Sequence, residues 1–308
     1  MERQRAHSFF VTPAWARILE AAGLGLTCTA LLATEGAQEV LLPVARKRDR
    51  FGFVSLRSMP WGTYGGPLAS GASDNFVEAA GAIVSHVRRT LGLGWFVATP
   101  GPWPHVPLGR QIATYSTQIL QLGAGVGELW KGLDKGTRNQ VRQAERAGVQ
   151  VVVDSTQAGF DEYYAMLQAS AERWGRRDPG KPRSLFDAIR ALTGDGRARL
   201  WLGRHGSRTA AGALCFYGKS EVFYWSGAMY SELARSRANN LIQWRVIQDA
   251  AARGFETYNM GSSGDLEGVR HFKAGFGPKP HEYPAYFAGT GPFRLAPAAL
   301  KLRRAGRR

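Results

Sequence analysis

The pattern of apolar and polar positions predicts short helices and strands along the whole chain. Thr12 and Pro13 are typical of a helix start and Gly23 of a helix end. Two apolar runs then flank a short glycine-containing segment, which indicates a hairpin. The expected elements of the first half are helices at 13–22 and 74–91 and strands at 26–33, 39–46, 51–57, 95–99 and 115–122.

The second half repeats this style of patterning. The β-branched run at 149–153 predicts a buried strand. The expected elements are helices at 127–147, 160–174, 184–192 and 238–253 and strands at 149–153, 198–204, 210–217, 221–228 and 255–260.

Both halves run in the same order through helix, hairpin, further strand, loop, helix and strand. A shared order of elements indicates that one α/β unit is duplicated. We therefore expect an α/β protein (α+β, layered) with two tandem domains and a cleft between them. The expected domains are residues 1–126 and 127–288, followed by a basic tail at 289–308.

A glycine-rich stretch at 258–277 places Asp265, Glu267, His271 and Lys273 directly after a predicted strand. Glycine lets the backbone turn sharply or approach a ligand, and loops held by rigid elements commonly carry sites. The stretch therefore predicts a functional pocket. A surface turn with solvated charges is the alternative from composition alone.

The charge balance is strongly basic. With 40 Lys and Arg against 24 Asp and Glu, the formal net charge is +16, which favours anionic partners or reflects generic surface charge. Within the predicted helix 127–147, five cations recur at spacings that place them on one face. They are Lys131, Lys135, Arg138, Arg142 and Arg146, and they predict an anion-binding face or, alternatively, a solvated one.

Several classes are disfavoured by what the sequence lacks. No apolar run is long enough to cross a bilayer, and the first residues do not read as a signal peptide, so a cytoplasmic location is expected. The two cysteines lie in apolar runs, and the six histidines show no ligand spacing, so no metal is expected. No serine-hydrolase elbow, Walker A loop or dinucleotide fingerprint occurs.

Several motifs together resemble the Fem-type transferases of the GNAT superfamily. They occur in order across residues 10 to 290, and each is loose when taken alone. The matching segments are Tyr64–Leu68, Leu129–Lys131, Arg138–Asn139, Ala144–Val149, Ala238–Trp244, Tyr258–Gly261 and the Phe-Lys signature at Phe272–Gly277.

This resemblance implies two GNAT-like domains, with the last segment folding back toward the first. It also implies transfer of an aminoacyl group from aminoacyl-tRNA to an amine of a peptide or cell-envelope precursor. An acyl-CoA-dependent N-acetyltransferase and a non-catalytic RNA- or anion-binding module remain as alternatives. The chain departs from the family pattern in lacking a long coiled-coil arm and in having no glycines at 235–240, which disfavours coenzyme A.

The resemblance places Lys273 at the donor end, where its charge would stabilise a tetrahedral oxyanion. An ion pair with Glu267 is the alternative for this lysine. Asp265, Glu267 or His271 are candidates to accept the amine proton. The expected donor- or phosphate-binding residues are Arg235, Arg237, Asn239, Arg138, Arg142 and Phe272, and the expected acceptor-binding residues are Tyr64, Trp225 and Tyr258, which could equally be core.

The expected partners follow from this assignment. They are tRNA as donor, with acyl-CoA as the alternative, and an anionic peptide- or nucleotide-linked acceptor, with no bound cofactor. The tail at 289–308 is a candidate for peripheral contact with an acidic membrane.

Overall fold

The computed structural model describes residues 8–35, 38–62, 64–69, 76–102, 107–192, 194–264 and 266–295. The chain forms two compact units. The first contains Phe10–Tyr115 and the residues from Glu282 onward, and the second contains Ser116–His281 together with Ser8 and Phe9. At Tyr115 and at His281 the change from one unit to the other falls within a strand, whereas the expected boundaries are at 126 and 288.

The first unit is a sheet in the order β1-β2-β3-β5-β12, with β4 beside β2. Val40, Leu42 and Phe96 of the sheet pack with Ile83 and Val87 of α2 in its core. The elements are α1 (Pro13–Ala21), β1 (Thr27–Glu35), β2 (Gln38–Arg48), β3 (Val54–Arg57), β4 (Leu68–Ala69), α2 (Phe76–Thr90), β5 (Gly94–Ala98), the start of β6 (Arg110–Gln121), most of β12 (Lys279–Gly289) and the 3-10 turn η3 (Gly291–Leu295).

The second unit is a sheet in the order β6-β11-β10-β9-β8-β7. β10 and β11 run parallel, and the other neighbours whose register is defined are antiparallel. The elements are α3 (Gly125–Gly132), α4 (Lys135–Arg146), β7 (Gln150–Asp154), α5 (Gln157–Arg173), α6 (Arg183–Leu192), β8 (Ala198–His205), β9 (Arg208–Tyr217), β10 (Glu221–Met229), the 3-10 turn η2 (Ser231–Ser236), α7 (Ala238–Ala252), β11 (Thr257–Asn259) and α8 (Glu267–Ala274).

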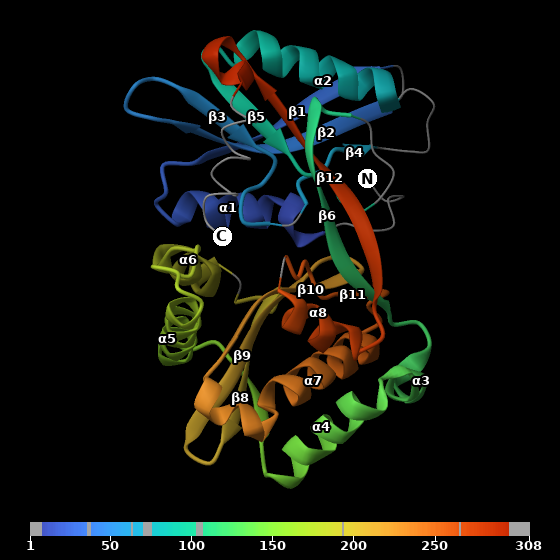
Figure 1. Cartoon of the computed structure of the whole chain (residues 1–308). Helices are drawn as coiled ribbons and strands as arrows, with labels where there is room; N and C mark the ends of the chain where they lie inside the picture. The colour runs from blue at the N-terminus through green and yellow to red at the C-terminus, as the bar shows by residue number, and fades with distance from the viewer. Residues whose placement is uncertain are drawn as a thin grey trace. The chain divides into compact units, whose positions relative to one another are not determined.

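Helices cover both faces of this second sheet. Within the unit, α7 packs on β8 and β9 and is itself covered by α4, whereas α5 packs on β9 and β10 beside α6 (Figure 1). Apolar residues of α7 such as Leu241, Ile242 and Val246 are buried in the core between helix and sheet. Burial of this kind is the main favourable contribution to folding.

The expected order of elements is largely confirmed. Helix α1 begins at Pro13 after Thr12, and β1 pairs antiparallel with β2 as the predicted hairpin. Strands β8, β9 and β10 and helix α7 also lie where the sequence predicts them. The cleft expected between the domains stays a prediction.

Two expectations are wrong. The helix expected at 127–147 breaks into α3 and α4, because Leu133 is extended and the side chain of Asp134 caps α4 by accepting from the Thr137 N–H. Lys131 therefore lies on a different helix from the other four cations. β7 is an edge strand rather than a buried one, and Val153 is 47 % exposed.

Candidate functional site

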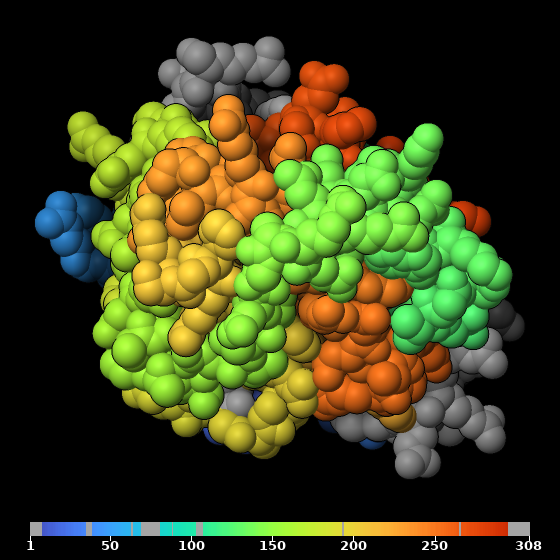
Figure 2. All heavy atoms as spheres, turned by 90° about the horizontal axis from the view of Figure 1, so that it is seen from below, coloured from blue at the N-terminus to red at the C-terminus, as the bar shows by residue number. Residues whose placement is uncertain are grey.

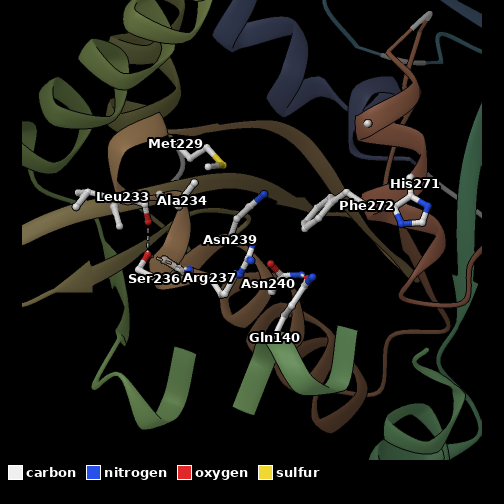
Figure 3. Close-up of a pocket in the computed structure, with 14 residues that line it drawn as sticks. Gln140, Met229, Leu233, Ala234, Ser236, Arg237, Asn239, Asn240, His271 and Phe272 are labelled. Atoms are coloured by element: carbon white, nitrogen blue, oxygen red, sulfur yellow. Dashed lines mark hydrogen bonds between the residues drawn. The ribbon is translucent and has the colours of Figure 1, made fainter. Parts of the chain in front are cut away.

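A pocket of about 250 Å³ lies within the second unit, at the start of α7. Four parts of the unit form its walls: β9 with the end of β10, the η2 turn, the first residues of α7, and one face of α8. Gln140 of α4 closes it from below (Figure 3). The lining residues are Gln140, Ala210, Ala211, Met229, Leu233, Ala234, Ser236, Arg237, Ala238, Asn239, Asn240, Gly268, His271 and Phe272.

The η2 turn reaches α7 through Arg237, whose backbone is left-handed with φ of 57°. Ser236 Oγ donates to the Leu233 carbonyl at 2.7 Å and accepts weakly from the Ala238 N–H at 3.4 Å. The Asn240 N–H donates to the Arg237 carbonyl at 3.0 Å. Two of the N–H groups that a helix start usually offers to an anion are therefore already used within the turn.

Side chains at this helix start carry unused polar groups. Arg237 Nε and Asn239 Oδ1 are buried and have no hydrogen-bond partner among the described residues. Asn240 is held in place, because its Nδ2 donates to Gln140 Oε1 at 2.8 Å. Buried polar groups without partners are costly, so Arg237 and Asn239 mark a place where a polar ligand would be stabilised.

The opposite wall comes from one face of α8. Gly268, His271 and Phe272 lie three and four residues apart and so share that face. Phe272 projects toward Asn239, and its ring packs edge-on against Phe276 with centroids 5.4 Å apart (Figure 3). His271 is exposed. The structure thus brings Arg237, Asn239, His271 and Phe272 together, as a shared site requires.

Lys273 follows Phe272 but points elsewhere. Its side chain is 3 % exposed, and its Nζ donates to the carbonyls of Gly261 and Ser262 at 3.1 and 2.9 Å. The Nζ lies 5.8 Å from the centre of the Tyr224 ring. Burial lowers the pKa of Lys273 to about 8.

The alternative role for Lys273 is wrong. Lys273 forms no ion pair with Glu267, because its buried Nζ bonds to backbone carbonyls and Glu267 is exposed at the first position of α8. Asp265, another candidate to accept the amine proton, lies outside the described residues.

The remaining donor candidates lie outside the pocket lining. Arg235 is exposed. Arg138 donates to the carbonyls of Lys131, at 2.9 Å, and Leu133, and so closes the C-terminal end of α3. Arg142 lies over the Trp130 ring at 5.4 Å. Their role in binding phosphate stays a prediction, and Arg138 has a structural partner already.

The three acceptor candidates are core residues. Tyr64 is fully buried in the first unit and packs against Tyr283. Trp225 is 8 % exposed and packs against Phe216 and Phe186, while Tyr258 is fully buried with its hydroxyl bonded to Gln243 Oε1 at 2.5 Å. Acceptor binding by these residues stays a prediction.

Sequence reasoning missed Gln140, Met229 and Asn240 as pocket residues. Gln140 lies in a helix expected for its cations, and its contact with Asn240 joins positions one hundred residues apart. It also missed Lys181, whose Nζ lies 4.7 Å from the centre of the Trp225 ring. Burial lowers the pKa of Lys181 to about 8, and Arg176 adds to this effect. No local pattern in the sequence signals that a lysine in a loop packs on a distant tryptophan.

Two further features bear on the class of the site. The described residues hold no group of three or more His, Cys, Asp or Glu side chains suited to a metal ion. In the same part of the chain, every helix is too short or too polar to span a bilayer.

The sequence matches a known family model over most of the second unit. Residues 133–274 match the model described as an acetyltransferase (GNAT) domain. This segment contains the whole pocket, and its match indicates that the chain has an acyltransferase domain. No curated protein matches the sequence.

Solved structures resemble the chain over nearly its full length. A crystal structure of FemX covers 96 % of both chains with a TM-score of 0.70 and 14 % identity. The C-terminal domain of a putative lysylphosphatidylglycerol synthetase from Agrobacterium fabrum covers 95 % of this chain and 91 % of its own, with a TM-score of 0.57 and 16 % identity. A tandem GNAT protein from the clavulanic acid biosynthesis pathway covers 87 % and 85 %, with a TM-score of 0.53 and 12 % identity.

At such low identity these structures establish the fold and not the reaction. The expected α/β fold of tandem GNAT type is confirmed, and so is the resemblance to Fem-type transferases.

Proposed function

We propose that the protein is a Fem-like N-acyltransferase that moves an aminoacyl group from aminoacyl-tRNA to an amine of a peptide or cell-envelope precursor. The GNAT acetyltransferase family match supports acyl transfer, and the fold similarity to FemX over 96 % of both chains supports the Fem-like layout. The donor and the acceptor are the parts of this proposal that experiment must decide.

The observation that carries the donor assignment is the start of α7. Coenzyme A places a pyrophosphate on glycine-rich backbone N–H groups in GNAT-like folds, as the family resemblance implies. Here the segment 235–240 has no glycine, and the N–H groups of Ala238 and Asn240 are occupied within the turn. Side chains replace the backbone as ligands, since Arg237 and Asn239 carry the unused polar groups. This exchange favours an altered donor over coenzyme A.

The proposed reaction is a direct displacement. The acceptor amine attacks the ester carbonyl of the aminoacyl group, forming a C–N bond and a tetrahedral oxyanion. The C–O bond to the ribose then breaks, and the ribose oxygen receives a proton while the amine nitrogen loses one. The net result is an amide and a free tRNA 3′ end.

Two groups of α8 are assigned to this reaction. The ammonium of Lys273 is buried outside the pocket lining and bonded to the Gly261 and Ser262 carbonyls, so its proposed stabilisation of the oxyanion acts without direct contact. His271 faces the pocket and is the candidate for accepting the amine proton, either directly or through the leaving oxygen. Glu267 lies four residues earlier on the same helix and is the second candidate.

The basic face of α4 is the proposed contact for the tRNA backbone. Lys135, Arg142 and Arg146 are exposed, and α4 lies at the surface of the second unit (Figure 2). Its Gln140 simultaneously lines the pocket, so the helix joins the exposed cations to the donor site. Phosphate contacts of this kind add affinity without reading sequence.

An acyl-CoA-dependent N-acetyltransferase is the second candidate, because the matching family model is described as an acetyltransferase domain. A third candidate is a non-catalytic module that binds RNA or another anion through α4.

Arg237 and Arg235 form a matched pair for testing the donor pocket. Arg237 lines the pocket and Arg235, two residues earlier, does not. We expect Arg237→Ala to lower the rate of aminoacyl transfer from charged tRNA by roughly 10- to 100-fold, the loss expected for one charge-assisted hydrogen bond. Arg235→Ala is expected to change the rate less than about threefold, within the range of exposed charges. Equal losses in the two variants would place the donor elsewhere.

A further inference from the structure

Asn259 at the end of β11 is fully buried and hydrogen-bonded on three sides. Its Nδ2 donates to Glu221 Oε2 at 2.8 Å. Its Oδ1 accepts from Thr117 Oγ1 at 2.6 Å and from the Gly261 N–H at 3.0 Å. One amide therefore connects β10, β6 and the glycine-rich segment that follows β11.

The chemistry of these partners sets the orientation of the amide. A backbone N–H can only donate, so the amide oxygen of Asn259 must face Gly261. The amide nitrogen then faces Glu221 and needs an acceptor there. The carboxylate of Glu221 supplies it.

Gly261 contacts both Asn259 and Lys273 through its backbone. Its backbone is left-handed with φ of 70°, a conformation that glycine adopts without strain. In this conformation its carbonyl accepts from Lys273 Nζ at 3.1 Å, and the next carbonyl, of Ser262, accepts at 2.9 Å. The residue that Asn259 holds by its N–H is thus the residue that holds Lys273 by its carbonyl.

Burial of the Glu221 carboxyl group costs folding free energy. It is 5 % exposed, and its second oxygen, Oε1, has no hydrogen-bond partner among the described residues. Burial raises its pKa to about 7, and the neighbouring side chains of Asn259 and Ser8 act in the opposite direction. A buried carboxyl of this kind lowers stability unless its partners compensate, and here the Asn259 amide depends on it as an acceptor.

We propose that Glu221 is a positioning residue for Lys273, acting through Asn259 to hold Gly261 and Ser262 in the conformation that presents two carbonyls to the ammonium. This proposal rests on the proposed function, in which Lys273 supplies charge to the reaction. Glu221 acts only through Asn259 and the loop.

The test measures Lys273 directly and needs neither donor nor acceptor. The intact protein is treated with acetic anhydride across a range of pH, and peptide mass spectrometry gives the acetylation rate of each lysine. Lys181 serves as an internal reference, because it is a partly buried lysine whose pKa is also lowered to about 8 and it lies against Trp225 instead of the loop. Denaturant unfolding of each variant is measured alongside.

Glu221→Leu removes the acceptor, and Glu221→Gln keeps one. In Glu221→Leu we expect the apparent pKa of Lys273 to rise by about one unit or more, because a displaced loop lets water reach the ammonium. Lys181 should titrate as before. In Glu221→Gln the apparent pKa of Lys273 should equal that of the wild type. Thr117→Val removes another hydrogen bond of Asn259 and should shift the apparent pKa of Lys273 in the same direction. This variant provides the test if Glu221→Leu does not fold.

Three results would overturn the proposal. The first is an unchanged apparent pKa of Lys273 in folded Glu221→Leu and Thr117→Val. The second is an equal shift of the apparent pKa of Lys181 and of Lys273. The third is a Glu221→Gln variant in which the pKa of Lys273 shifts as much as in Glu221→Leu. Aminoacyl transfer is assayed separately. If the wild type transfers nothing while the pKa of Lys273 responds to the variants as expected, the proposed function is contradicted and the positioning role stands. In an active enzyme, Glu221→Leu should lower kcat with little change in the donor KM.

Discussion

At the scale of single residues, Lys273 is the unusual feature of the site. A buried ammonium without a carboxylate partner among the described residues is expensive, and here two backbone carbonyls compensate for part of the cost. The Phe-Lys motif could be located from sequence. The carbonyl partners could not, because they depend on how the glycine-rich loop folds back over α8.

This burial makes stability depend on pH. The pKa of Lys273 is about 8 in the folded protein and near 10.5 when solvated. Below pH 8 both states carry the proton. Between 8 and 10.5 only the unfolded chain binds it, so the free energy of unfolding rises with pH, by about 3 kcal/mol for this group.

Lys273→Met removes this contribution. We expect the wild type to gain more stability than the variant between pH 7.5 and 10.5 in urea unfolding. Lys181 contributes with the same sign in both proteins and therefore cancels in the comparison. Parallel stability curves for the two proteins would contradict a buried, charged Lys273.

At the scale of elements, the sequence predicts types and order better than ends and contacts. Helix α7 is well predicted because its boundaries and apolar residues are local. The break between α3 and α4 was missed, although Asp134 three residues before Thr137 is a capping pattern, because the cation spacing suggested one continuous face. β12 was not predicted at all, since its pairing with β5 depends on residues far away in sequence.

The α3–α4 junction gives an element-scale prediction. A Cβ on Gly275 would lie 2.2 Å from Thr137 Oγ1 and 2.7 Å from Asp134 Oδ2, where the cap of α4 forms. Gly275→Ala is therefore expected to cost about 2 kcal/mol of stability, through overlap and loss of the cap. Gly127→Ala in α3 is the control, because a Cβ there meets nothing within 4 Å and alanine favours the helix. Similar unfolding midpoints for the two variants would show that the junction is loose.

At the scale of the whole molecule, the net charge of +16 is informative only through its placement. Composition could not decide between an anion-binding surface and generic charge. The structure favours α4 as the anion-binding surface, because Lys135, Arg142 and Arg146 are exposed on the helix that also reaches the pocket.

The salt dependence of tRNA binding separates these cases. Replacing Lys135, Arg142 and Arg146 by Ser together should reduce the slope of log K against log salt by about two to three, the value for as many lost phosphate contacts. The matched control replaces Arg46, Lys47 and Arg48 of β2, which are exposed and carry the same charge. Equal slopes for both triple variants would assign the effect to net charge and not to α4.

The most direct measurement offers both donors at once. Wild-type protein is incubated with a mixture of charged tRNAs, acetyl-CoA and a pool of amine acceptors, and the products are identified by mass. We expect aminoacyl adducts, dependent on charged tRNA and lost in Lys273→Ala, with no acetyl adduct above background. Acetylated products that form without tRNA, or no product under any condition, would contradict the account.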